Sequence, residues 1–205
     1  MDLNNPIPQE WTSYVTQSAV GLEVVPAHLY DVLTYTDNAT RNLNFFQQTN
    51  VAESISNMKA AGMLPNPQSF LIQNIRIFFR TTLETVDAGA AGPLASLMND
   101  VILLSNTGIA KLEIGTKKYG PWPMWTLPAS TFAKGSLSQA GAEAANLTQG
   151  YMQLDGPLYP LFPNLMIAPL QNFALELAWP QAAVDLTANM VIQVLFDGQL
   201  ARAVQ

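Results

Sequence analysis

The sequence contains no cysteine and only one histidine, His28. The lack of cysteine excludes disulfide bonds and thiolate metal sites, and it leaves the redox compartment open. A catalytic triad, a histidine metal centre and a histidine general base all need imidazole, and a single histidine is thin support for any of them. We interpret His28 as a structural or surface residue. We expect a protein that is not an enzyme, with no catalytic residues, no metal site and no cofactor.

Charge is also scarce. Nine Lys and Arg and fifteen Asp and Glu make up only 12 % of the 205 residues, whereas globular proteins usually carry about 25 %. A soluble monomer needs a charged surface, but a chain packed among neighbours can replace much of it with apolar and amide contacts. The composition therefore favours a subunit of an assembly. The net charge of −6 and the absence of a basic block argue against direct nucleic-acid binding.

No hydrophobic run is long and continuous enough for a membrane-spanning helix. The longest uncharged stretch, Gly156 to Leu175, has the required length but contains four prolines that would break such a helix. Residues Met1 to Glu10 lack the basic start and apolar core of a secretion signal, so we expect no export. Hydrophobic residues at 49 %, with 12 Gly and 14 Pro, predict a folded chain of short elements separated by turns.

Alternation of apolar residues with period 2 predicts the main strands. They are expected at Arg41–Phe46, Ser69–Arg80, Ile109–Ile114, Phe173–Trp179 and Val191–Phe196, the last ended by Asp197-Gly198. Shorter candidates lie at Trp122–Leu127, Thr131–Lys134, Tyr151–Leu154 and Asn164–Ile167. In Ser69–Arg80 the apolar residues fall on both sides, with Leu71, Ile75, Ile77 and Phe79 opposite Phe70, Ile72 and Phe78. We therefore expect both faces of this strand to be covered.

One helix is predicted between the strands. Pro93 marks its first turn, an apolar stripe runs from Leu94 to Leu104, and Asn106 and Gly108 end it. The small residues of Ser136 to Thr148 fit a short helix or a long exposed loop equally well.

Eight or nine short strands with one helix predict an all-β fold, a two-sheet sandwich over residues 39–205. Residues 1–38 are expected to form an irregular N-terminal arm or edge segment. For this segment we favour a short helix or strand that covers the domain edge over an arm that reaches a neighbouring subunit or a membrane.

The aromatic residues Tyr119, Trp122 and Trp125 are candidate contact or stacking residues. Sugars stack on exposed rings, and rings in loops also anchor subunit contacts. We favour a contact or core role, because no cluster of Asp, Asn and Arg accompanies the rings in the sequence.

Paired carboxylates are the remaining route to catalysis, since glycoside hydrolysis needs only two of them at a suitable separation. The candidates are Asp155, Glu113 and Glu176. Each is expected in a turn or on the solvent face of a strand, so we favour a solvated role.

Three segments resemble jelly-roll capsid proteins of tailless icosahedral bacteriophages. They are Asn50 to Asn57, Gly62 to Ile72, and the strand Asn172 to Leu175. The resemblance implies a viral jelly roll whose strands stand in a shell and whose subunits form trimers or larger capsomers. Two eight-stranded rolls do not fit comfortably in 205 residues. We therefore expect an all-β single jelly-roll β-sandwich with one short helix inserted between strands.

These observations predict a structural virion protein, a capsid shell subunit that acts by self-assembly. Its expected partners are copies of itself, as a trimer, and other virion proteins, with no direct contact to nucleic acid. Membrane contact through the N-terminal segment belongs to the alternative in which that segment is an arm. Its expected location is the virion, after assembly in the host cytoplasm. The alternative is a carbohydrate- or receptor-binding β-sandwich module in which Tyr119, Trp122 and Trp125 form the stacking platform.

Overall fold

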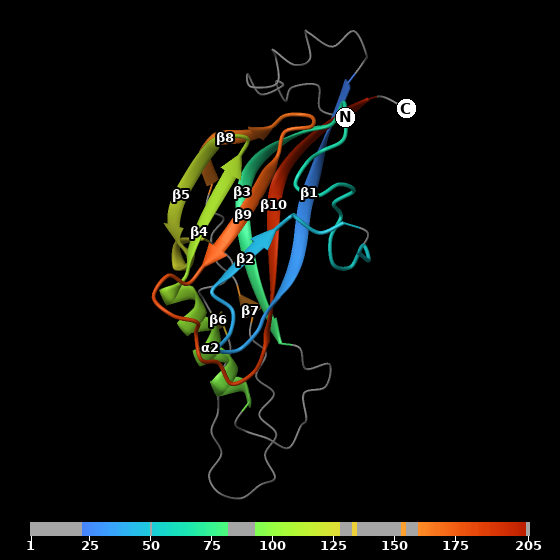
Figure 1. Ribbon diagram of the computed structural model, residues 1–205. Helices are drawn as coiled ribbons and strands as arrows, with labels where there is room; N and C mark the ends of the chain where they lie inside the picture. Colours follow the sequence, from blue (N-terminus) through green and yellow to red (C-terminus); the bar gives the residue numbers. More distant parts are fainter. Residues whose placement is uncertain are drawn as a thin grey trace, which may run out of the picture.

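Eight strands with inward-facing apolar residues form two four-stranded antiparallel sheets (Figure 1). Sheet A has the order β1-β10-β3-β8, from β1 (Leu22–Tyr35), β10 (Met190–Ala203), β3 (Ser69–Thr81) and β8 (Pro160–Ile167). Sheet B has the order β2-β9-β4-β5, from β2 (Asn42–Phe45), β9 (Phe173–Ala178), β4 (Ile109–Ile114) and β5 (Lys117–Pro123). Helix α2 (Pro93–Thr107), the short 3-10 helix η1 (Met124–Thr126) and the strand pair β6 (Ala133–Lys134) and β7 (Gln153–Leu154) lie outside the two sheets.

The computed structural model of the chain describes residues 22–49, 51–81, 93–127, 133–134, 153–154 and 160–203. The predicted all-β sandwich is confirmed, because two antiparallel sheets form a sandwich and helix α2 lies between β3 and β4. Residues 1–21, which precede β1, and the whole of the segment Ser136 to Thr148 lie outside the described residues.

The eight strands of the two sheets pair in a nested way. β1 pairs with β10, β2 with β9, β3 with β8 and β4 with β5, always antiparallel. This pattern results when one long antiparallel ribbon, with the β4–β5 turn at its tip, folds over itself. The additional pairs β10–β3 and β9–β4 then divide the folded ribbon into two sheets.

The core lies between the sheets and is rich in aromatic residues. The ring of Phe46 lies 4.5 Å from that of Phe196 in sheet A and 5.4 Å from that of Phe173 in sheet B. Nearer α2, the rings of Tyr35 and Trp179 meet edge to face at 4.6 Å. These rings are fully buried, and burial of this much apolar surface is the main stabilising term in a sandwich.

Residues 22–35, which we expected in the irregular N-terminal arm or edge segment, form strand β1 at the edge of sheet A. β1 pairs with β10 along its whole length, from Leu22 opposite Ala203 to Tyr35 opposite Met190. Its inward positions include the buried carboxylate of Asp31, and Pro26 interrupts its outward side. The apolar alternation is therefore weak in the sequence, and the sandwich begins before residue 39.

The predicted division of β3 side chains into two faces is wrong for the first part of the strand. The pairing of β3 with both neighbours shifts at Gln73, so this residue is a β-bulge. A bulge adds one residue, and the side chains before it change faces. Phe70 and Ile72 therefore face the core, whereas Leu71 packs on the outer face with Ala201.

Two further expectations are corrected. β10 does not end at Asp197-Gly198 but continues to Ala203, because Gly198 lies at the β3 bulge, where only a glycine fits against the Leu71 carbonyl. Only Trp122 and Pro123 of the predicted strand Trp122–Leu127 lie in a strand. β5 ends at Pro123, and the Met124 N–H donates to the carbonyl of Gly108, which turns the chain into η1.

Candidate functional site

The outer faces of the two sheets differ in chemistry. Sheet B presents charged pairs across its strands, with Lys111 Nζ 3.3 Å from Glu176 Oε2 and Lys118 Nζ 3.9 Å from Glu113 Oε2. Sheet A presents partly exposed apolar side chains on adjacent strands. They include Tyr30, Val32, Phe78, Val191 and Leu195. Sheet B therefore has a solvated face, while the outer face of sheet A is poor in charge.

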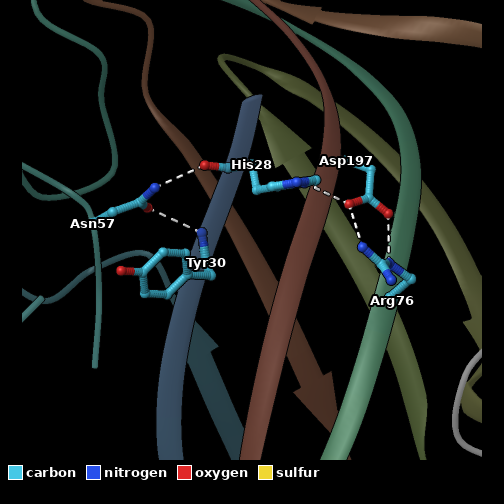
Figure 2. Close-up of polar contacts among 5 residues, drawn as sticks. All are labelled: His28, Tyr30, Asn57, Arg76 and Asp197. Atoms are coloured by element: carbon cyan, nitrogen blue, oxygen red, sulfur yellow. Dashed lines mark hydrogen bonds and ion pairs between the residues drawn. The ribbon is translucent and has the colours of Figure 1, made fainter. Parts of the chain in front are cut away.

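One charged cluster lies in the middle of the outer face of sheet A (Figure 2). Asp197 on β10 accepts two contacts from the guanidinium of Arg76 on β3, with Nε 2.5 Å from Oδ2 and Nη2 2.5 Å from Oδ1. His28 on β1 approaches the same carboxylate, with Nδ1 2.7 Å from Oδ1. The cluster therefore connects three adjacent strands, and residues far apart in the sequence contribute to it.

In this cluster Arg76 neutralises the Asp197 carboxylate, and the contacts link β1, β10 and β3 to one another. The pair combines one charge-assisted hydrogen bond, donated by Arg76 Nη2, with an ion-pair contact at Nε that makes no hydrogen bond, and the Asp197 side chain is only 13 % exposed. Arg76 also lies over the ring of Phe78, with Cζ 5.5 Å from the centroid. His28 is 60 % exposed, which agrees with its interpretation as a structural or surface residue. The Arg76–Asp197 pair is neutral as a whole, so the cluster adds little net charge to the outer face of sheet A.

The free edge of β1 is covered by residues 56–57. Asn57 Oδ1 accepts a hydrogen bond from the Tyr30 N–H at 3.0 Å, and Asn57 Nδ2 donates to the His28 carbonyl at 2.7 Å (Figure 2). Ser56 Oγ donates to the Tyr30 carbonyl at 3.2 Å. Exposed edge strands pair readily with other chains, and proteins block them in this way. The middle of the β1 edge is therefore closed to strand addition.

Asp31 joins β1 to the segment that follows β2. Its carboxylate is fully buried and accepts hydrogen bonds from the backbone N–H of Phe46 at 2.6 Å and of Val32 at 3.1 Å. Gln48 Nε2 donates to it at 3.4 Å. Burial raises the pKa of the Asp31 carboxyl above its ordinary value, and the hydrogen bonds offset this only in part.

A cavity of about 250 Å³ lies beside the β1 edge, between β1, the end of β10 and residues 57–68. Its lining includes the buried apolar side chains Leu29, Met58 and Leu64. Lys59 and Arg202 also line it, and Arg202 Nε is paired at 2.5 Å with Glu23. Sites for small molecules usually measure about 300–1,000 Å³, so this cavity is suited to a single side chain.

The three predicted aromatic residues do not share one exposed surface. Tyr119 and Trp122 lie on β5 opposite Leu112 and Ala110, and both pack partly buried against the core. Trp125 belongs to η1 and is 54 % exposed. Tyr119 and Trp122 thus contribute to the core with part of their surface, and Trp125 is the most exposed of the three rings.

The candidate carboxylates are brought together only in part. Glu113 on β4 and Glu176 on β9 lie on the outer face of sheet B as diagonal neighbours, each paired with a lysine. Asp155 lies outside the described residues. The two glutamates occupy an open sheet face rather than a cleft.

Sequence reasoning missed the functional features around β1. The ion cluster, the Asn57 bridge and the cavity all depend on contacts between residues distant in the sequence. In the sequence, the segment Asn50 to Asn57 stands out only by its resemblance to jelly-roll capsid proteins, which does not predict a contact with β1.

Neither the family models nor the searches of curated proteins and of solved structures yielded a match. In the described part of the chain, no helix has the length and apolar character to cross a membrane. Within the same residues, His, Asp and Glu side chains do not gather in a group of three that could hold a metal ion.

Proposed function

We propose that this chain is a structural virion protein, a capsid shell subunit built as a single jelly roll and acting by self-assembly. The nested pairing of the eight strands carries the proposal. A jelly roll is an eight-stranded double sheet made of two Greek keys, and viral capsid proteins, lectin domains and cupins use it. The strand orders β1-β10-β3-β8 and β2-β9-β4-β5, which place the paired strands in the same sheet, support this proposal.

Among capsid proteins, lectin domains and cupins, the surface chemistry of this chain supports the capsid class. Metal-binding cupins need several histidines, and the chain has one. The charge-poor outer face of sheet A and the self-neutralised Arg76–Asp197–His28 cluster suit burial against neighbours. As a shell subunit, the protein would have copies of itself, in trimers, and other virion proteins as partners. It would reside in the virion after assembly in the host cytoplasm.

Electron microscopy of the purified native protein tests this function. Negatively stained samples at rising protein concentration should contain rings or closed shells of uniform size, because a shell subunit makes repeated contacts with itself. Fields without any uniform particle at the highest concentration would contradict the proposal.

The carbohydrate- or receptor-binding alternative now depends on Trp125, because Tyr119 and Trp122 face the core. It predicts binding in a glycan screen that Trp125→Ala abolishes without changing thermal unfolding. Binding that survives this substitution would exclude the stacking role.

A further inference from the structure

Phe162 is the most exposed large apolar side chain in the described part of the molecule. It lies on β8 and is 99 % exposed. An aromatic side chain buries about 150–250 Å² when it packs. A ring left entirely in water therefore contributes none of this apolar burial to stability. β8 is an edge strand of sheet A, and Phe162 lies between the residues of β8 that pair with β3, so the exposed ring belongs to this edge of the sandwich.

The cavity beside β1 lies at the opposite edge of the same sheet. β1 and β8 are the two edge strands of sheet A, and Figure 1 shows β1 and residues 51–68 on one flank and β8 on the other. One flank of each copy therefore carries an isolated aromatic ring, and the other flank carries a small apolar cavity.

The cavity matches an aromatic ring in size and lining. A cavity of about 150 Å³ lined by apolar side chains is enough to bind benzene, and this one measures about 250 Å³. Two methionines, Met58 and Met63, line it together with leucines, and thioethers adapt to aromatic rings and contact them favourably.

Charge at the contact is also compatible. Lys59 lines the cavity, and an ammonium group near an aromatic face is attractive. Strand β8, Pro160–Ile167, carries no charged residue that could oppose Lys59 or Arg202.

We propose that Phe162 of one copy inserts into the cavity lined by Met58, Met63 and Leu64 of the next copy. This inference rests on the proposed self-assembly and names the contact that produces it. A surface patch that fits a cavity elsewhere on the same molecule makes a head-to-tail contact, which closes into a ring when the rotation allows. Because the ring and the cavity lie on opposite edges of sheet A, each subunit uses both of its flanks.

Three variants test the contact by sedimentation velocity over a concentration series. Phe162→Ala removes the ring, and Met63→Trp fills the cavity while leaving Phe162 in place. Ile102→Ala, at a 52 % exposed position on α2, is the matched control. Phe162→Ala and Met63→Trp should each weaken assembly by about 10- to 100-fold, in line with burial of one aromatic side chain, and the control should assemble like the native protein.

Mixing the two defective variants gives the sharpest result. Each retains one half of the contact, so an equimolar mixture should form a 1:1 dimer at concentrations at which neither variant associates alone. Where Met63→Trp alters the circular dichroism spectrum, Gln68→Trp replaces it as the cavity-filling variant.

Native-like assembly of Phe162→Ala, or a mixture that contains only monomers, would overturn the contact. In the first case the shell function stands and another surface mediates assembly. A native protein that stays monomeric at every concentration would overturn both the contact and the shell function.

Discussion

At the scale of single residues, Gly198 shows most directly how the strands constrain one another. A Cβ atom at this position would lie 1.8 Å from the Leu71 carbonyl oxygen, which is backbone and cannot rotate away. Gly198→Ala should therefore force β10 and β3 apart at the bulge and lower the free energy of unfolding by about 2–4 kcal/mol. Urea denaturation of the two proteins measures this difference. A loss below about 0.5 kcal/mol would mean that the bulge relaxes freely.

Asp31 makes stability depend on pH. Because burial raises its pKa in the folded state, proton uptake favours folding. This contribution is fully present below the unfolded carboxyl pKa of about 3.9 and is lost as the pH rises through the higher folded value. The carboxylate therefore lowers stability at neutral pH relative to acid pH, and an asparagine in its place cannot take up the proton.

Comparison of the native protein with Asp31→Asn isolates this effect, since the other acidic groups are common to both. The free energy of unfolding of the native protein minus that of Asp31→Asn should be larger at about pH 4 than at about pH 7. Denaturant titrations at the two pH values provide the difference. A difference that stays constant, or that grows toward neutral pH, would contradict the raised pKa.

At the scale of elements, the edge of β1 is the feature with the clearest consequence. Asn57 pairs with the Tyr30 N–H and the His28 carbonyl as a neighbouring strand would. Asn57→Ala should leave both groups without this partner and cost about 1–2 kcal/mol. It should also raise the hydrogen-exchange rate of the Tyr30 amide at least about tenfold, because the edge opens more often.

The control for this substitution is Asn42→Ala, which removes an exposed asparagine from β2. Amide exchange within β1 should be unchanged in the control. If the Tyr30 amide exchanged at the same rate in Asn57→Ala and in the native protein, Asn57 would not be what keeps the β1 edge closed.

The elements that could be predicted from the sequence are those with strong local patterns. β9 alternates without interruption between buried and partly exposed residues from Phe173 to Leu177, and α2 begins at a proline and ends before Gly108. β1 could not be recognised, because Pro26 and the buried Asp31 break its alternation. The bulge at Gln73 is set by pairing with β10 and β8, so it leaves no local signal in the sequence.

For the candidate site, only the scarcity of charge could be predicted from the sequence, not the residues or strands that form it. Scarce charge indicated buried surfaces, but the charge-poor face could be assigned to sheet A only once strand pairing was known. The Arg76–Asp197 pair joins residues 121 positions apart. Tyr119 and Trp122 were selected for their residue type, although their place in β5 directs them to the core.

At the scale of the whole molecule, the two ends of the sandwich are built differently. α2, β6 and β7 lie together at one end (Figure 1), where Asp100 of α2 accepts a hydrogen bond from the Thr187 N–H at 2.9 Å. The connection between β4 and β5 at the opposite end is a short turn through Gly115. Among the described residues, these additional elements are thus confined to one end, away from the β4–β5 turn.

The mass of the native protein in solution tests self-assembly most directly. Light scattering across a concentration series should give a discrete multiple of 22.3 kDa, a trimer or a larger closed assembly, that persists as the protein is diluted through the micromolar range. A mass of 22.3 kDa at every concentration would contradict the shell function.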